Sequence, residues 1–411
     1  MANVSSSNGL EKRPKLRFSG FDGPIKSAHL SQYLVENKER NKNLIYTKSD
    51  VLSVSGEYGI INQIEFQGRS FAGESVAEYH VVETNDIVYT KSPLKANPYG
   101  IIKVNNGAPG IVSTLYAVYH PCEGTVAEYI DYYFGNDLRL NKYLKPLVNI
   151  GAKHDMKVNN ETVLTGEVYF PGYSEQKKIV GFLTILDERI RQQRNLVEAL
   201  KKYKRGVMQH IFRRTTTQSV KAWTCVRLGD IFKKVSRRNT DGLVKNVITN
   251  SAEYGLIPQR DFFDKDIAVD GNTANYYVIE KGDFVYNPRK SNTAPYGPFN
   301  RYTLDEKGII SPLYTCLVLK ADIYPSYLAW YFKSDAWHRY IYDNGSQGVR
   351  HDRVSMTDDL LMGIPVIFPD QAKQQEYADI LDKIDARLQA AQKVYDLLIK
   401  EKCGYMQQLF I

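Results

Sequence analysis

Residues 97–100 of the chain read NPYG and hold side chains that could serve amino-group chemistry. An Asn-Pro-x-aromatic motif is how many amino-methyltransferases hold a target base beside the methyl donor. The same four residues also suit a turn, because proline presets one backbone dihedral and glycine accepts positive dihedrals that other residues avoid. A short motif carries little weight without its structural context, so the turn is the favoured interpretation.

An internal repeat decides between the two interpretations. VLSVSGEYGII at residues 51–61 returns as VITNSAEYGLI at 247–257, and DIVYTKSPLKANPYG at 86–100 returns as DFVYNPRKSNTAPYG at 283–297. GIVSTLYAVY, which begins at Gly110, matches GIISPLYTCLV, which begins at Gly308. The second copy of NPYG reads APYG and lacks the asparagine, and no glycine-rich turn for a nucleotide-like donor follows a strand. We therefore expect Pro98-Tyr99-Gly100 and Pro295-Tyr296-Gly297 to be one structural turn in two related domains.

Each copy consists of a strand-rich head followed by a long helix. Short β-branched and aromatic runs such as HVVETNDIVYT and NYYVIEKGDFVYN are broken by Gly, Asn and Asp, as strands and their turns are. Helical periodicity follows in AEYIDYYFGNDLRLNKYL and PSYLAWYFKSDAWHRYI. The sequence predicts a tail at 1–15, heads at 16–170 and 226–368, long helices at 171–212 and 369–411, and a linker at 213–225.

Both long helices carry a heptad seam. The first seam comprises Ile179, Leu183, Leu186, Ile190, Gln193, Val197 and Leu200, and the second comprises Tyr377, Leu381, Ile384, Leu388, Ala391, Tyr395 and Leu398. Residues 201–214 hold six basic and no acidic side chains, whereas 370–385 hold five acidic and two basic ones. These charges favour an antiparallel helix pair, although each helix could instead cover only its own head.

An antiparallel pair gives an α+β fold of two mixed α/β heads joined by two long coiled-coil helices with pseudo-twofold symmetry. Helices of roughly 35 residues would hold the heads on the order of 50 Å apart, at about 1.5 Å per residue. One turn of duplex DNA is about 34 Å, so two such heads could reach sites one to one and a half turns apart. This spacing suits a split target.

The chain resembles the specificity subunit of type I restriction-modification systems, from about residue 15 to the end. The resemblance rests on the two copies, on the strand turns DIVYT and DFVYN, and on a proline followed by E-Q-x-x-I at the start of a long helix that ends near K-x-G-x-M-Q. These motif residues are Pro171, Glu175, Gln176, Ile179, Lys204, Gly206, Met208 and Gln209. The second copy keeps Pro369, Gln374, Lys402, Gly404, Met406 and Gln407 but places Lys373 and Tyr377 where Glu and Ile are expected.

The resemblance implies a non-catalytic subunit whose heads each read one half of a bipartite DNA sequence. It further implies that the helices dock two modification subunits, which would methylate adenine with S-adenosylmethionine, and that restriction and motor subunits join the complex. No cofactor is expected in this chain itself. Independently, the sequence contains no H-E-x-x-H motif, no P-loop and no paired metal ligands.

Composition agrees with DNA as a partner. The formal charge is +8 and the chain has 30 tyrosines, a combination that suits phosphate contacts and base stacking, although tyrosine also serves protein interfaces. Four scattered cysteines argue against a disulfide framework, and no long apolar stretch or signal peptide is evident, so we expect a cytoplasmic protein.

Two pairs of matched loops carry the donors and basic groups that base reading needs. The first pair is Lys91, Lys95 and Asn97 against Arg289, Lys290 and Asn292. The second is Lys153 and His154 against Arg350, His351 and Arg353, with Ser346 and Gln347 just upstream. The shared His-Asp pairs, His154-Asp155 and His351-Asp352, are expected to be structural hydrogen bonds, because no nucleophile accompanies them.

Two other functions stay open. The chain could be a scaffold whose helices space two protein-binding heads, in which case its binding would ignore DNA. It could also be a methyltransferase with an unrecognised donor site, which labelled donor and DNA would reveal.

Overall fold

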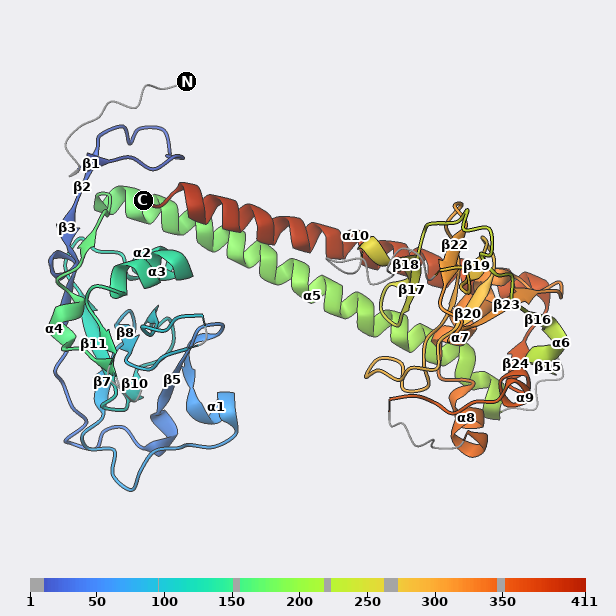
Figure 1. Cartoon of the computed structure of the whole chain (residues 1–411). Helices are drawn as coiled ribbons and strands as arrows, with labels where there is room; N and C mark the ends of the chain where they lie inside the picture. Colours follow the sequence, from blue (N-terminus) through green and yellow to red (C-terminus); the bar gives the residue numbers. More distant parts are fainter. Residues whose placement is uncertain (1–10, 95, 151–155, 218–222, 262–272, 346–351) are drawn as a thin grey trace. The chain divides into compact units, whose positions relative to one another are not determined.

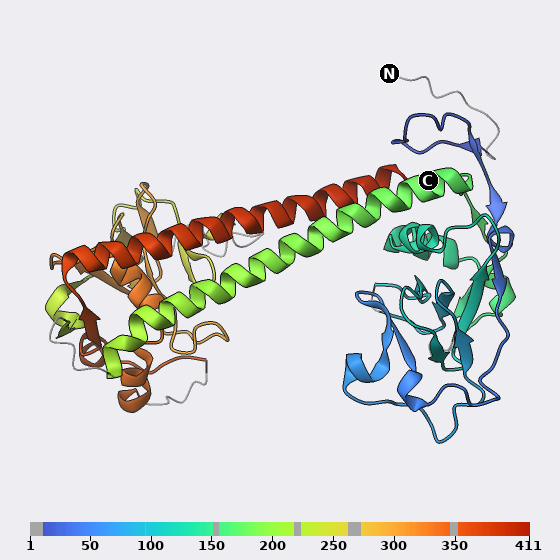
Figure 2. The same ribbon diagram turned by 180° about the vertical axis from the view of Figure 1, so that it is seen from behind.

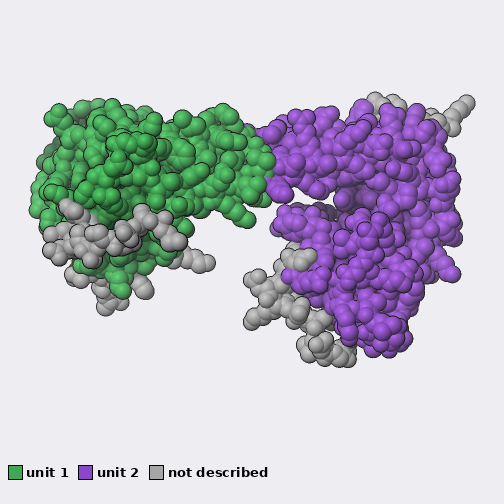
Figure 3. Space-filling model, turned by 90° about the horizontal axis from the view of Figure 1, so that it is seen from above, with its two compact units in different colours: residues 1–194, 394–411 green, residues 195–393 purple. Residues whose placement is uncertain are grey.

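A computed structural model describes residues 11–94, 96–150, 156–217, 223–261, 273–345 and 352–411. The chain divides into two compact units, one formed by 1–194 with 394–411 and the other by 195–393. Each unit therefore combines one head, the beginning of the long helix that follows it, and the end of the other long helix. Figure 3 shows the two units in different colours.

The first head is built around a four-stranded antiparallel sheet in the order β4-β11-β8-β9. Its strands are β4 (Leu34–Glu36), β11 (Tyr116–Pro121), β8 (Ile87–Thr90) and β9 (Ile102–Val104). Antiparallel pairs surround it: β1 (Glu11–Lys12) with β2 (Ile25–Lys26), β3 (Ala28–His29) with β14 (Glu167–Val168), β5 (Leu52–Ser55) with β6 (Gly59–Asn62), β7 (His80–Val82) with β10 (Gly110–Val112), and β12 (Asn149–Ile150) with β13 (Met156–Lys157). The short helices are α1 (Gln63–Gln67), α2 (Ala127–Phe134), α3 (Asp137–Leu144) and α4 (Asn160–Val163).

The second head repeats this topology. Its four-stranded sheet has the order β16 (Phe232–Val235), β23 (Thr315–Leu319), β20 (Phe284–Tyr286) and β21 (Phe299–Arg301). The pairs are β15 (Thr224–Arg227) with β24 (Pro365–Phe368), β17 (Ile248–Ser251) with β18 (Gly255–Pro258), and β19 (Tyr277–Ile279) with β22 (Gly308–Ile310). The helices are α6 (Leu228–Ile231), α7 (Pro325–Lys333), α8 (His338–Asn344) and α9 (Asp358–Met362). The mixed helix and sheet architecture predicted for both copies is confirmed.

Part of the tyrosine content is a property of the cores. Seven buried tyrosines donate their hydroxyl protons to backbone carbonyls: Tyr89, Tyr119, Tyr143, Tyr286, Tyr302, Tyr327 and Tyr331. Each such bond stabilises the fold by about 1 kcal/mol net and avoids the larger cost of an unpaired buried hydroxyl. These side chains are therefore not available for stacking on bases.

The proline-glycine turns are structural in both heads. The Tyr89 hydroxyl donates to the Tyr99 carbonyl at 2.7 Å, and the Tyr286 hydroxyl donates to the Tyr296 carbonyl at 2.9 Å. Gly100 and Gly297 have φ of +89° and +84°. A Cβ at Gly297 would lie 2.0 Å from the Asn287 carbonyl oxygen, so only glycine fits. The predicted shared turn is confirmed.

Two long helices, α5 (Tyr173–Thr217) and α10 (Gln371–Gln408), run antiparallel and pack together, as the heptads predicted. Figure 1 and the opposite view in Figure 2 both show them side by side. No residue of either predicted seam is exposed, whereas off-seam apolar residues such as Ile185 and Leu397 are. Among the described residues, no helix is both long enough and apolar enough to cross a bilayer.

Matched ion pairs join the helices within each unit. In the second unit the Lys204 ammonium lies 2.8 Å from the Asp385 carboxylate, and in the first unit Lys402 pairs with Asp187. The two pairs are related by the repeat, with each partner shifted by 198 residues. An aromatic ring, Trp330 or Tyr132, lies beneath each lysine. The lysine of the K-x-G-x-M-Q motif thus fixes the antiparallel register.

The end of each long helix packs into the core of the other copy's head. The end of α5 lies in the second head, and the residues that follow α10 lie in the first head. Phe212 of α5 packs on Tyr327 and Tyr331, with ring centroids 5.7 and 5.8 Å apart. Phe410, which follows α10, packs on Tyr129 and Tyr133 at 5.3 and 6.1 Å. All three rings of one cluster lie 198 residues from their counterparts in the other. Burial of a phenylalanine is worth about 3–5 kcal/mol against alanine, so these ends are strongly held.

Buried glutamines join each helix to its own head. Gln176 accepts a hydrogen bond from the Val126 amide at 2.9 Å and donates to the Pro171 carbonyl at 2.8 Å. Gln374 accepts from the Tyr324 amide at 2.8 Å and donates to the Pro369 carbonyl at 2.8 Å. The proline and glutamine of the sequence motif are therefore a repeated structural joint.

Substitution of Gly297 by alanine should destabilise the second unit by about 2 kcal/mol or more, because the new methyl group meets a backbone carbonyl at a positive φ. All three tryptophans, Trp223, Trp330 and Trp337, lie in that unit, so urea unfolding followed by tryptophan fluorescence reports on it. The control is Gly206→Ala, on α5 of the same unit with open space around it, which should stabilise by up to about 1 kcal/mol. Equal stability of the two variants would contradict the close approach.

Reversing one charge of the Lys204–Asp385 pair should lower the free energy of unfolding, and reversing both should recover part of the loss. The pair is about three-quarters buried, so we expect a coupling of about 1 kcal/mol between Lys204→Asp and Asp385→Lys. A double-mutant cycle in the same urea assay measures it. Strictly additive losses would show that the pair does not fix the register.

Candidate nucleic-acid interface

In the second head, the structure brings one predicted loop against the described end of the other. The segment after β20, which holds Arg289, Lys290 and Asn292, lies against the segment 352–354. The Lys290 amide donates to the Asp352 carbonyl at 2.9 Å, and the Val354 amide donates to the Pro288 carbonyl at 2.9 Å. Arg289 and Arg353 are directly opposite each other across this bridge. The described end of the second predicted loop therefore shares a surface with the first loop.

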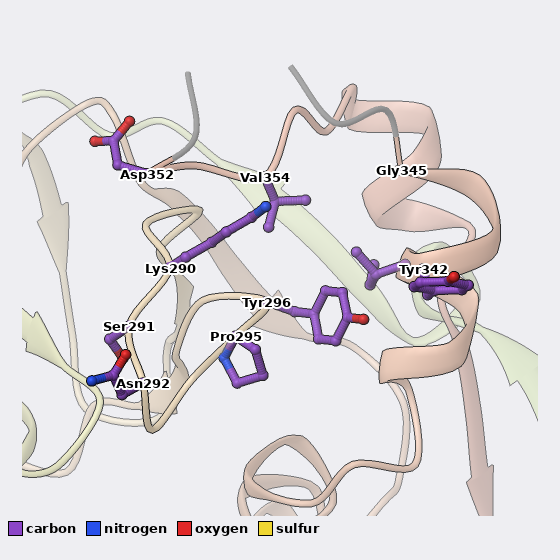
Figure 4. Close-up of a pocket in the computed structure, with 10 residues that line it drawn as sticks. Lys290, Ser291, Asn292, Pro295, Tyr296, Tyr342, Gly345, Asp352 and Val354 are labelled. Carbon is purple, nitrogen blue, oxygen red and sulfur yellow. The ribbon is translucent and has the colours of Figure 1, made fainter. Parts of the chain in front are cut away.

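This surface contains a cavity of about 470 Å³ (Figure 4). Lys290, Ser291 and Asn292 line it from the loop, Tyr296 from the proline-glycine turn, and Tyr342 from α8. Arg289 and Asn292 are exposed, and Lys290 and Arg353 are half-buried. An ammonium group and hydroxyl and amide groups can contact phosphates and base edges, and aromatic rings can stack on base faces. The sequence comparison did not single out Ser291, which aligns with Leu94, or Tyr342, which lies on a helix outside the two matched loops.

Three buried asparagines hold this loop. The Asn287 side-chain oxygen accepts a hydrogen bond from the Arg289 backbone amide at 3.0 Å. The Asn287 side-chain nitrogen donates to the Asn250 backbone carbonyl at 3.3 Å. Asn300 donates to the Asn250 side chain at 2.7 Å. The first head has Val54, Thr90 and Lys103 at the matching positions. The two heads thus share a backbone frame and support their loops with different side chains.

In the first head, the predicted loop is held differently. The Asn97 side chain is buried and donates to the Asp137 carboxylate at 3.0 Å, which ties the loop to the start of α3. Asn141 of α3 donates to the Ala96 carbonyl at 3.0 Å. Asn97 accordingly positions the loop, and its side chain does not lie at the surface. Lys91 is half-buried, and burial, with a contribution from Arg40, lowers its pKa.

Six of the predicted contact residues lie outside the described residues: Lys95, Lys153, His154, Gln347, Arg350 and His351. The same holds for Asp155 of the first His-Asp pair, while Asp352 of the second is described and exposed. Among the described residues, no group of three His, Cys, Asp or Glu side chains could hold a metal ion.

His80 in β7 has a buried imidazole that feels the positive charges of Arg40 and Lys91. Burial is the main cause that lowers its pKa from 6.5 to about 4, and the positive charges of Arg40 and Lys91 add to it. Its Nδ1 has no hydrogen-bond partner among the described residues. The folded head therefore keeps this histidine neutral where an unfolded chain would protonate it.

The free energy of unfolding of the first unit should consequently fall as the pH is lowered from about 7 to about 4. In that window the unfolded chain binds a proton at residue 80 that the folded chain does not, so stability rises with pH. His80→Gln should flatten the dependence relative to wild type, measured by urea unfolding and circular dichroism at several pH values. Burial raises the pKa of nearby Asp86, and the comparison with wild type removes that contribution. An unchanged slope would contradict a buried neutral imidazole.

Comparison with known proteins finds similarity in structure only. No family model and no curated protein matches the chain. A type I restriction-modification system S subunit from M. genitalium matches with a TM-score of 0.57 and 14% sequence identity, over 97% of this chain and 99% of that one. A structure described as the basis of complex assembly and conformational transition of the type I R-M system matches with a TM-score of 0.52 and 16% identity, over 94% and 97%. The chain therefore has, along nearly its whole length, the fold of a type I restriction-modification S subunit.

Proposed function

We propose that this chain is the DNA-specificity subunit of a type I restriction-modification system. Each head reads one half of a bipartite duplex target, and the paired helices set the gap between the halves. Two adenine-methylating subunits dock on the helices and use S-adenosylmethionine, and restriction and motor subunits join the complex. The chain performs no chemistry of its own and acts in the cytoplasm.

The observation that carries the proposal is the contrast between the frames and the loops of the two heads. Sheet order, turn, glutamine joint and helix-end clusters repeat, while the loop supports do not. A single repeated frame is expected where two units approach the same double helix, and different loop side chains are expected where they read different bases. The similarity of fold to S subunits supports the same function.

The second head offers the best-defined contact surface. Arg289 is exposed beside Lys290, and together they present two positive charges next to the cavity. Phosphate contacts position a protein on DNA without sequence preference, whereas contacts to base edges discriminate sequences. In our proposal Arg289 and Arg353 provide phosphate or guanine contacts, and Asn292 reads a base edge. Lys91 has the matching task in the first head, and Lys95, Lys153, His154, Gln347, Arg350 and His351 remain predicted contacts.

The direct test is selection of random duplexes by the chain assembled with its modification subunits. We expect enrichment of two short half-sites separated by a fixed gap. Binding of protein partners that ignores DNA, with no enriched duplex, would instead favour the scaffold, and labelled methyl transfer by the isolated chain would favour a methyltransferase.

Arg289→Ala should weaken binding to the selected duplex by about 1–3 kcal/mol. If Arg289 contacts phosphate, the loss of affinity is equal for all sequences, and the slope of the logarithm of the binding constant against the logarithm of the salt concentration falls by about one. If Arg289 reads guanine, one position of a half-site loses its base preference. A binding titration at several salt concentrations measures both quantities. The control is Arg339→Ala, an exposed arginine of α8 paired with Asp343, which should bind as wild type. Equal losses in the two variants would contradict a specific role for the loop.

A further inference from the structure

A β-hairpin tip repeats in the two heads and is not explained by reading different bases. Ser55-Gly56-Glu57-Tyr58-Gly59 joins β5 to β6, and Ser251-Ala252-Glu253-Tyr254-Gly255 joins β17 to β18. The register is the same, with Ser55 opposite Gly59 and Ser251 opposite Gly255.

The fold requires only some of these residues. The Ser55 hydroxyl accepts hydrogen bonds from the Glu57 and Tyr58 amides, and the Ser251 hydroxyl accepts the same pair from Glu253 and Tyr254. Gly59 and Gly255 have φ of +71° and +75°, as a three-residue hairpin loop demands of the residue that follows it. The central positions of such a turn accept most residues, so the turn does not require Glu or Tyr.

The repeated glutamate and tyrosine nevertheless project from the surface. Tyr58 is 58% exposed and Tyr254 is 60% exposed, and both glutamates are exposed. Tyr58 contacts Phe66 at 5.6 Å between ring centroids, a contact that leaves most of its ring accessible.

A second repeated apolar side chain lies at the same end of each head. Leu115 and Leu313, which follow β10 and β22, are 65% and 59% exposed. Parallel bridges join Val51 to Ile111 in the first head and Val247 to Ile309 in the second. Since the paired strands run in the same direction, the hairpin tip and the leucine turn emerge at one end of the head.

The chemistry of this end favours a protein over a nucleic acid. The carboxylate at each hairpin tip repels the phosphates of a nucleic acid. The exposed tyrosine and leucine suit an apolar contact with a protein, and the carboxylate beside them suits an arginine or lysine of that protein. In the first unit the tip also borders a groove of about 760 Å³ beside α5 and α10. Four carboxylates and two ammonium groups line that groove: Glu57, Glu128, Asp131, Asp187, Lys103 and Lys402.

Lys402 pairs with Asp187, and Lys103 lies 3.7 Å from Asp131. Neither Glu57 nor Glu128 forms an ion pair with a residue that the structure describes. The groove therefore keeps two negative charges for a basic side chain of a partner.

We propose that the two hairpin tips, each with its neighbouring leucine turn, are matched docking points for one protein that binds the chain twice and presents a basic side chain to Glu57 or Glu253. Identical exposed residues on heads with different loops indicate an identical partner at each head. This inference rests on the proposed function, in which that partner is the modification subunit.

The test titrates the full chain with the purified modification subunit of the same system and counts bound copies by native mass spectrometry. Wild type should bind two copies. Tyr58→Ala should weaken one site at least tenfold, as expected for a buried interface tyrosine, and give a one-to-one complex at concentrations where wild type is saturated. Tyr58→Ala with Tyr254→Ala should weaken both sites, Glu57→Lys with Glu253→Lys should do the same, and Tyr58→Phe should retain binding.

Leu138→Ala is the matched control, since it removes an exposed apolar side chain of α3 that the second copy replaces by Ala336. This variant should keep both modification subunits. Two subunits bound to the doubly substituted chain with wild-type affinity would overturn the docking assignment alone. Loss of duplex binding by the isolated chain, with subunit binding intact, would overturn it in favour of a DNA contact. Failure of wild type to bind either the subunit or a split duplex would overturn the proposed function as well.

Discussion

The insertion of each long helix into the core of the opposite copy's head is the constraint on which the structure depends. Phe212 completes an aromatic cluster with Tyr327 and Tyr331, and Phe410 completes its counterpart with Tyr129 and Tyr133. Neither core is complete within its own copy, so folding of either unit requires residues from both halves of the sequence. The helix seam and the lysine-aspartate pairs then set the register between these anchored ends.

This arrangement separates the structural residues from the residues that can vary. The glutamine joint, the glycine turn and the helix ends are buried and repeated, and each is tied to backbone groups. The loops after β8 and β20 lie at the surface of the same frame, and one is supported by an asparagine network that the other lacks. The proposed reading of two different half-sites needs a fixed frame with replaceable loops, and the proposed docking points use the same frame at both hairpin tips.

The features that could be predicted from sequence are those with a regular period or a steric requirement. The heptads located both seams, because burial on one side of a helix imposes a spacing of three and four residues. The replacement of NPYG by APYG argued against asparagine chemistry and left a turn. The structure agrees, because Gly297 has no room for a Cβ. The insertion of Phe212 and Phe410 was not predictable, since neither lies in a heptad position and the contact joins residues more than a hundred positions apart. Asn97 shows the same limit, because a polar loop residue that bonds to Asp137 has the same sequence signature as one that faces solvent.

The claim that the paired helices set the gap in a split target can be tested by inserting one heptad into α5 between Ile190 and Val197 and another into α10 between Leu388 and Tyr395. Seven residues add about 10 Å along a helix and preserve the seam, so the gap between half-sites should grow by about three base pairs while the half-sites stay the same. Mapping of methylated adenines in cells that carry wild type or the lengthened chain measures the gap directly. A lengthened chain that assembles with its partners and methylates sites with the original gap would contradict the role assigned to the helices.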